Sequence, residues 1–291
     1  MARILITGGT GLVGKRLTQL LIDKNHEVLI LSRNPKNENE FKWDIVKNYI
    51  DEKAFKNIDF IIHLAGAGIA DERWTKKRKQ VIIDSRVKTA NLLFEKVNEL
   101  KLELKGFISA SGIGYYGAIT SKTIFKETDK SGSDFLAEVC QKWEAAAHQF
   151  SKINIPITIL RTGIVLAAKG GALEKMKTPA ISPLGSGKQY IPWIHIDDLC
   201  QMYIQSIEAN LIGIYNAVAP EHQTSITFSK TLAKSIKRPY LGIGVPAFML
   251  KILFGELAVI LLEGSRISTK KIEKNGYSFR FETLKKALNN L

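Results

Sequence analysis

The feature that most constrains the fold is a short apolar run that meets a glycine-rich turn within residues 1–14. The run Ile4-Leu5-Ile6 is too short for a helix and ends at Thr7-Gly8-Gly9, so it predicts a buried strand that enters a tight turn. A second apolar run, Val28–Leu31, completes a strand–helix–strand unit. The helix between them is predicted by apolar residues that recur at helical spacing, at positions 12, 13, 17, 20 and 21.

The glycines of this turn are typical of a dinucleotide site. Their spacing is G-x-x-G-x-x-G rather than G-x-G-x-x-G. Unpaired N–H groups at a helix N-terminus attract a diphosphate, and glycines let it approach them. A plain glycine-rich turn is the alternative, but the second strand follows at the distance that a binding unit requires. The residues expected to contact the cofactor here are Thr7, Gly8, Gly9, Thr10, Gly11, Leu12, Val13 and Gly14.

This unit predicts an α/β fold: a doubly wound parallel sheet of the Rossmann type, with the ligand beyond the carboxyl ends of the strands. The second strand ends at Ser32-Arg33, where such folds read the adenosine ribose. A carboxylate there would accept a hydrogen bond from a 2′-hydroxyl and would repel a 2′-phosphate. Because the chain has Ser32 and Arg33 instead, we predict NADP(H) as the cofactor. The alternative is a surface arginine at a strand end.

Composition bounds the remaining possibilities. The chain has 291 residues, of which 45% are hydrophobic, and no apolar stretch of membrane-spanning length. We expect a cytoplasmic protein that does not bind a membrane, with a Rossmann domain at 1–240 and a small helical domain at 241–291. A homodimer and a monomer are both open as its assembly state. Neither its two cysteines nor its five scattered histidines have metal-site spacing, so no metal is expected.

A net charge of +14 would suit a nucleic-acid binder. However, the lysines are dispersed, and the densest cluster, Lys76–Lys79, is only four residues long. A solvated helix face explains this cluster more simply, and the same positive field favours small phosphate-bearing molecules. We therefore expect a small-molecule substrate and no nucleic acid.

Seven segments carry a family resemblance through nearly the whole chain: ITGGTGLVG, HLAGAGIADERWTKKRKQVIIDSR, ISASGIGYYG, DFLAEVCQKWE, LRTGIVLAAKGGAL, PLGSGKQYIPWIHIDDL and VPAFMLKILFGELA. Together they resemble the atypical, extended branch of the short-chain dehydrogenase/reductases, of the NAD-dependent epimerase/dehydratase type, with a C-terminal domain of unknown function (DUF1731). The resemblance implies an NADP(H)-dependent epimerase or oxidoreductase. Its substrate would be a sugar-nucleotide-like molecule or another hydroxy or carbonyl compound.

The resemblance also implies further cofactor contacts. The turn Leu64-Ala65-Gly66 looks like the one whose backbone lies against the cofactor ribose. Ile164 lies in a segment that resembles the one passing under the nicotinamide. One long helix or two abutting helices are expected over residues 73–100. Arg86 in this segment either faces the cofactor or forms a salt bridge on the helix surface.

The usual catalytic pair of the superfamily is missing. Its members use a tyrosine and a lysine four residues later on one helix face. With Trp143-Glu144 fixing the register, these positions hold Leu136 and Cys140. Leucine cannot transfer a proton, and Cys140 has no histidine nearby in the sequence to activate it as a nucleophile.

Other residues must then act if the protein is an enzyme. Ser111 matches the superfamily serine that binds a substrate carbonyl, or else bonds a neighbouring backbone group. Tyr116, or else Tyr115, is expected to place a phenol beside the nicotinamide; the alternative is that both rings only pack in the core. If Tyr116 serves the substrate, Tyr116→Phe lowers turnover without weakening NADP(H) binding. His195 is a further candidate, although a structural role is the simpler interpretation. Asp197 is expected to be a helix N-cap. The other hypothesis is a non-catalytic NADP(H)-binding sensor or regulatory protein.

Overall fold

An eight-stranded sheet forms the centre of the computed structural model, which describes residues 1–291. The strands follow the order β11-β8-β6-β5-β1-β2-β3-β4, and every pair is parallel except β3–β4. The chain runs outward from β1 on one side and then returns to β5 on the other, which confirms the predicted doubly wound α/β fold. The bounds are β1 (Arg3–Thr7), β2 (Glu27–Ser32), β3 (Glu40–Asp44), β4 (Tyr49–Ile50), β5 (Phe60–His63), β6 (Gly106–Gly112), β8 (Ile157–Thr162) and β11 (Gly213–Ala217).

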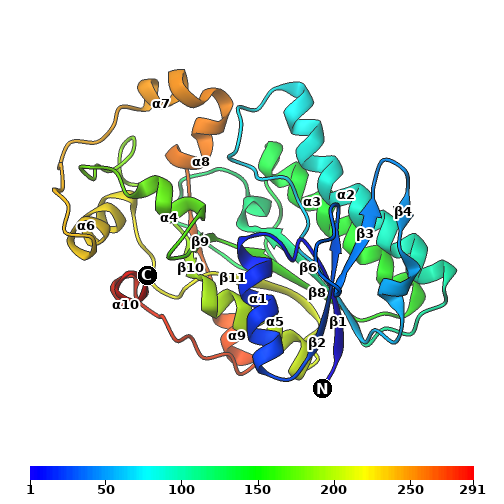
Figure 1. Ribbon diagram of the computed structural model, residues 1–291. Coiled ribbons are helices and arrows are strands. Elements are labelled where there is room, and N and C mark those ends of the chain that lie inside the picture. The colour runs from blue at the N-terminus through cyan, green and yellow to red at the C-terminus, as the bar shows by residue number, and fades with distance from the viewer.

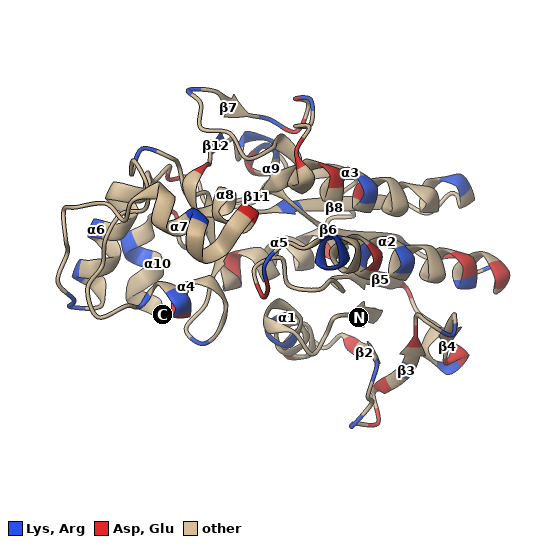
Figure 2. Ribbon diagram, turned by 90° about the horizontal axis from the view of Figure 1, so that it is seen from above, with Lys and Arg blue, Asp and Glu red and all other residues tan.

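Helices cover both faces of this sheet (Figure 1). Helices α1 (Leu12–Asp23) and α5 (Ile196–Glu208) lie on one face, and α2 (Lys76–Glu99) and α3 (Phe135–His148) on the other. Figure 2 shows the same division from above, with basic and acidic residues interspersed along α2 and α3.

The pleat of β1 explains this division. Side chains of a strand alternate between the two faces, so Ile4 and Ile6 pack in one core cluster with Leu17 of α1. Leu5, between them, packs in the opposite cluster with Leu93 of α2. The short apolar run of the sequence is therefore buried on both faces, as expected of a central parallel strand.

The smaller elements lie beyond the carboxyl ends of the strands or along the flank of the sheet. Helices α7 and α8 stand above that carboxyl edge (Figure 1), and none of the helices is both long and apolar enough to cross a bilayer. The bounds are α4 (Gly171–Met176), α6 (Ser225–Ser235), α7 (Ala247–Phe254), α8 (Val259–Leu262), α9 (Lys270–Lys274), α10 (Leu284–Asn290), β7 (Ile124–Phe125), β9 (Ile164–Leu166), β10 (Trp193–His195) and β12 (Arg266–Ile267), with 3-10 turns at Glu52–Phe55, Ile113–Tyr116, Gln149–Ile153 and Gly255–Ala258.

The C-terminal segment is anchored to the sheet domain by a buried carboxylate. Asp198 of α5 accepts hydrogen bonds from the Tyr277 hydroxyl and from the amides of Arg280 and Phe281, at 2.9–3.0 Å. Beyond this anchor, α10 packs on α6, and both contribute to one apolar cluster. The expected domain boundary at residue 240 stays a prediction, since residues on both sides share this cluster.

A buried histidine joins the turns that follow β1 and β5. The Nδ1 atom of His63 lies 2.8 Å from Oγ1 of Thr7, and the same oxygen accepts a 3.2 Å hydrogen bond from the amide of Ala65. Nε2 lies 3.3 Å from the carbonyl oxygen of Arg86. Burial lowers the pKa of His63 to about 4. The neutral imidazole therefore holds the two turns together.

We predict that the stability of the protein falls below pH 6.5 because of His63. The unfolded chain binds a proton near pH 6.5 and the folded chain only near pH 4, so this stability is complete above 6.5 and is lost as the pH falls toward 4. Between pH 7 and 5 the loss is about 2 kcal/mol. Urea unfolding at pH 7 and pH 5 measures this loss of unfolding free energy in the wild type and in His63→Asn. The control is His148→Asn, at an exposed histidine. An equally steep pH dependence in His63→Asn would contradict the assignment.

Candidate functional site

The turn between β1 and α1 is too crowded for side chains. Gly8 has a φ of +72°, and a Cβ there would lie 2.9 Å from the carbonyl carbon of Leu64. A Cβ at Gly14 would overlap the carbonyl oxygen of Gly8 and lie 2.6 Å from the Cα of Gly9. The two glycines therefore let the turn, the first turn of α1 and the end of β5 meet at backbone distance.

The N-terminus of α1 is open to an anion. Gly11, its N-cap, has no side chain to cap the helix. The amides of Leu12 and Val13 have no acceptor within the protein. Such free N–H groups carry the positive end of the helix dipole and suit a phosphate group. The segment Thr7–Gly14 thus fits a diphosphate.

The end of β2 offers a cation and no carboxylate. Arg33 is exposed and forms no ion pair, while its carbonyl oxygen accepts from Lys42 Nζ. Ser32 is buried, and its Oγ accepts a 3.2 Å hydrogen bond from the amide of Asn34, which leaves its proton free to donate. A guanidinium and a hydroxyl at this strand end suit a phosphate ester better than a free 2′-hydroxyl.

The turn after β5 brings Leu64, Ala65 and Gly66 beside the glycine turn. Arg86 of α2 holds the end of this turn by hydrogen bonds. Its Nη1 donates to the carbonyl oxygens of Ala67 and Ile82 at 3.0 and 2.9 Å. Burial lowers the pKa of Arg86 to about 10, and no carboxylate pairs with it. This rules out the surface salt bridge that the sequence left open for Arg86.

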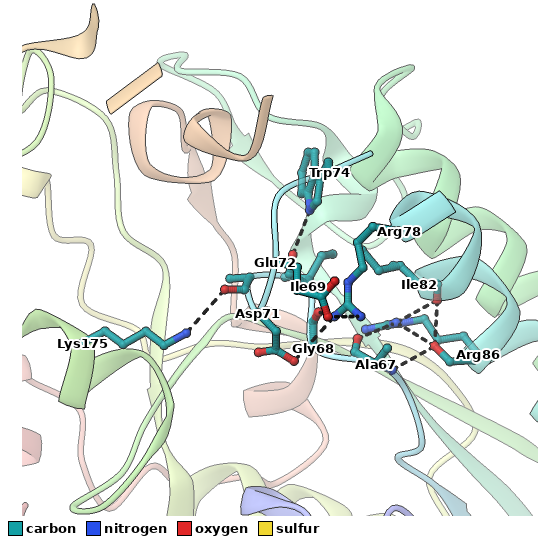
Figure 3. Close-up of polar contacts among 12 residues, drawn as sticks. Ala67, Gly68, Ile69, Asp71, Glu72, Trp74, Arg78, Ile82, Arg86 and Lys175 are labelled. Carbon is teal, nitrogen blue, oxygen red and sulfur yellow. Dashed lines mark hydrogen bonds and ion pairs between the residues drawn. The ribbon is translucent and has the colours of Figure 1, made fainter. Parts of the chain in front are cut away.

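A strap of residues, 67–75, continues from this turn toward α2 (Figure 3). Each carbonyl from residue 67 to 70 accepts a hydrogen bond from a different side chain. The donors are Arg86, Arg78 at 2.7 Å, Trp74 at 2.8 Å and Lys175 of α4 at 3.4 Å. Sequence reasoning missed Arg78 and Lys175, because nothing in their spacing marks them as partners of this loop.

On the other side of the site, Ile164 starts β9 two residues after β8 ends. Its amide donates to the carbonyl oxygen of Pro192 at 2.8 Å. The side chain is half-buried. Ile164 therefore lies at the carboxyl edge of the sheet, and its contact with a nicotinamide stays a prediction.

Ser111 lies at the end of β6 and is bonded to a buried ion pair. Its hydroxyl donates to Oε1 of Glu144 at 2.7 Å. Glu144 also receives two 2.8 Å hydrogen bonds from Arg161, and both charged side chains are almost fully buried. This fork-to-fork pair ties α3 to β8. Sequence reasoning missed it, although an arginine that directly continues the apolar run Ile157–Leu160 is a signal of a buried charge.

The two candidate phenols differ in their partners. The Tyr116 hydroxyl donates to Oδ1 of Asn216 at 2.7 Å and accepts from Arg161 at 3.1 Å. Burial raises the pKa of Tyr116 to about 12. Tyr115 is half-buried, its ring lies 3.3 Å from the Arg161 guanidinium, and its hydroxyl has no partner in the protein. The phenol that the sequence favoured, Tyr116, is thus the one already engaged in a buried network.

The positions of the usual catalytic pair lie on α3, as the register predicts. Leu136 packs in an apolar cluster with Trp74 and residues of α8. The Cys140 thiol is buried beside the Gly112 carbonyl, and burial raises the pKa of Cys140 to about 11, which disfavours a thiolate nucleophile. One Tyr-x-x-x-Lys spacing does occur, at Tyr49 and Lys53, but it starts on the edge strand β4 rather than in a helix.

His195 has a structural role. It is the N-cap of α5: its Nδ1 accepts a 3.0 Å hydrogen bond from the amide of Asp197, and its ring stacks on Phe281 at 3.7 Å. The expectation that Asp197 caps this helix was therefore wrong by two residues. Asp197 lies in the first turn instead and pairs with Arg16 of α1 at 2.6 Å, a contact across two helices that local pattern cannot predict.

Comparison with known proteins agrees with this geometry. Residues 4–217 match the NAD dependent epimerase/dehydratase family, and residues 245–291 match a domain of unknown function, DUF1731. The chain is 33% identical over 297 residues to the epimerase family protein SDR39U1 of Mus musculus, with 99% of each chain covered. It is 34% identical over 302 residues to the epimerase family protein SSP1921 of Staphylococcus saprophyticus, with 100% of this chain and 99% of that protein covered.

Two solved structures are similar to this chain over nearly its whole length. Human epimerase family protein SDR39U1 (isoform 2), crystallised with NADPH, has a TM-score of 0.88 and 31% identity, covering 99% of this chain and 98% of that one. A nucleoside-diphosphate sugar epimerase from Corynebacterium glutamicum has a TM-score of 0.80 and 29% identity, covering 99% of this chain but 58% of that one. The chain therefore belongs to the NAD-dependent epimerase/dehydratase family, with DUF1731 as its C-terminal domain.

Proposed function

We propose that the protein binds NADP(H) and catalyses an oxidoreduction or epimerisation of a small hydroxy or carbonyl compound, such as a sugar-nucleotide-like molecule. The observation that carries the cofactor assignment is an unpaired Arg33 at the end of β2 combined with an uncapped α1. The NADPH present in the crystals of human SDR39U1 supports it. The cofactor would supply hydride transfer.

In this proposal the chain holds the cofactor with three groups of residues. The diphosphate would bind at Thr7 to Gly14, and the 2′-phosphate would bind at Ser32 and Arg33. The nicotinamide half would lie against Leu64, Ala65, Gly66, Arg86 and Ile164. The amides of Leu12 and Val13 are free to donate, and the crowded glycines leave space only for the backbone.

We predict that NADPH binds at least about tenfold more tightly than NADH, because only its 2′-phosphate forms a charged hydrogen bond with Arg33. Arg33→Ala removes most of this preference by weakening NADPH and leaving NADH unchanged. Isothermal titration calorimetry measures the dissociation constants of NADPH and NADH for each variant. Lys24→Ala, the same charge loss at the far end of α1, is the control. Equal affinity of the wild type for the two cofactors would remove Ser32 and Arg33 from the site.

Among the candidate proton donors we assign the role to Tyr115. Ser111 already donates to Glu144, and Tyr116 to Asn216. A hydroxyl that serves a substrate oxygen must have its proton available for it. The Tyr115 hydroxyl has no protein partner, and the neighbouring Arg161 guanidinium would stabilise negative charge on that ring. Ser111 and Tyr116 would then act as positioning residues through Glu144 and Arg161.

A second function, a non-catalytic NADP(H) sensor, has specific support. The positions of the catalytic pair hold Leu136 and Cys140, and both Ser111 and Tyr116 are engaged in buried hydrogen bonds. A sensor needs the cofactor site alone. The two functions therefore differ only in whether hydride is exchanged between the cofactor and a substrate.

Deuterium transfer distinguishes them. We expect the wild type, given a metabolite extract, to form a deuterated alcohol from NADPH deuterated at C4, or a new isomer of an extract component when NADP+ is supplied instead. Mass spectrometry detects both products. Tyr115→Phe slows this at least about a hundredfold, the usual contribution of a general acid, with NADPH affinity unchanged. Tyr49→Phe, at an exposed tyrosine, is the control. If the wild type forms neither product when it is saturated with NADP+ or with either C4 epimer of deuterated NADPH, the sensor function holds.

A further inference from the structure

Helix α7 and the loop before it expose a group of large apolar side chains. In the helix, Phe248 is 64% and Ile252 is 69% exposed, and in the loop Ile243 is 84% exposed. The whole group, called the α7 face below, consists of Leu241, Ile243, Phe248, Met249, Ile252, Leu253 and Phe254. Scattered single residues of this kind are normal on a soluble protein, whereas a contiguous group marks a surface that contacts a partner.

The α7 face is displayed by a helix that is held in place. Leu250, on the inner side of α7, is buried. At the end of the helix, Arg73 of the strap 67–75 donates from Nε to the carbonyl oxygen of Leu253 at 2.9 Å. Residues 240–246 and Met249 surround an open hollow of about 500 Å³ beside the helix. The outward apolar side chains are therefore not covered by packing within the chain.

The segment that carries the α7 face is basic and has no carboxylate. Residues 222–255 contain five lysines or arginines and no aspartate or glutamate. All five are exposed: Lys230, Lys234, Lys237, Arg238 and Lys251. Helix α6, which carries the first two, lies at the same end of the molecule as α7 in both views (Figures 1 and 2). The next carboxylate, Glu256, pairs with Lys79 of α2. The surroundings of the apolar group therefore favour a negatively charged partner.

We propose that the α7 face binds the surface of an anionic lipid bilayer. Its apolar side chains enter the boundary between headgroups and acyl chains, and the cations of residues 222–255 lie against the headgroup phosphates. The expectation that the protein does not bind a membrane rested on the absence of a spanning stretch, which such an interfacial contact does not need. The inference is independent of the proposed cofactor and of any catalysis.

A second copy of this chain fits the α7 face less well. A two-fold contact would place the five cations of one copy opposite the same cations of the other, with no carboxylate of the segment to pair with them. The apolar side chains also come from two unlike structures, a helix and an irregular loop. A fluid bilayer accommodates both without a matching shape, whereas a protein partner must be complementary to them.

Co-sedimentation with vesicles tests the apolar part of the contact. The full chain is expected to bind vesicles of phosphatidylcholine mixed with phosphatidylglycerol, less as the salt concentration rises, and to bind pure phosphatidylcholine vesicles only weakly. Phe248→Ser combined with Ile252→Ser is expected to weaken binding to the anionic vesicles at least about tenfold, because both side chains lose apolar area that the bilayer buries. Ile22→Ser combined with Ile212→Ser, at two exposed residues away from α7, is the control and should change nothing.

Charge variants test the electrostatic part. Lys237→Gln combined with Lys251→Gln is expected to weaken binding to the anionic vesicles at least about fivefold and to make it less sensitive to salt. Lys53→Gln combined with Lys56→Gln removes the same charge near β4, at the opposite end of the molecule, and should stay within about twofold of the wild type. This pair of variants separates a local contact from the general attraction of a protein with a net charge of +14.

Three results would overturn the inference. The first is a wild type that binds neither kind of vesicle, even if it captures an acidic protein. The second is an equal loss of binding in the α7 variants and in their controls. The third is a dimer, seen by analytical ultracentrifugation, that the double variant at Phe248 and Ile252 dissociates while vesicle binding is absent, which would assign the α7 face to a second copy.

Discussion

The close contact between the turns after β1 and β5 is the constraint on which the site depends. Gly8 lies against the backbone of Leu64 with no space for a Cβ, and Thr7 and His63 bond each other beneath that contact. Both turns belong to adjacent parallel strands, so their carboxyl ends open on the same edge of the sheet. The free amides of α1 and the backbone of the second turn consequently face one region, which a dinucleotide is long enough to span.

The fold could be predicted largely from local pattern. Short apolar runs, glycine turns and helical periodicity each report on neighbours in the sequence, and a parallel sheet with its covering helices is assembled from such units. The cofactor contacts stay predictions, but the geometry of the site was predictable where it consists of backbone and small residues, as at Gly8 and Ala65. It was not predictable where a side chain meets a distant partner. Asp197 pairs with Arg16 instead of capping its helix, and the Tyr116 hydroxyl bonds Asn216, a hundred residues away.

The departure from the superfamily is concentrated on one face of α3. Leu136 and Cys140 replace the tyrosine and lysine, yet the region keeps a buried positive charge in Arg86 and a free phenol in Tyr115. The Glu144–Arg161 pair, bonded to Ser111 and Tyr116, fixes the loop that carries this phenol. The proposed enzyme would thus keep the binding half of the site and carry out its acid–base chemistry from neighbouring elements.

A crystal structure of the complex with NADPH tests the central claim most directly. The account places the diphosphate oxygens on the amides of Leu12 and Val13, the 2′-phosphate on Arg33 and the nicotinamide half of the cofactor across the turn after β5. A cofactor bound with its diphosphate away from α1, or with its 2′-phosphate remote from Arg33, would contradict it.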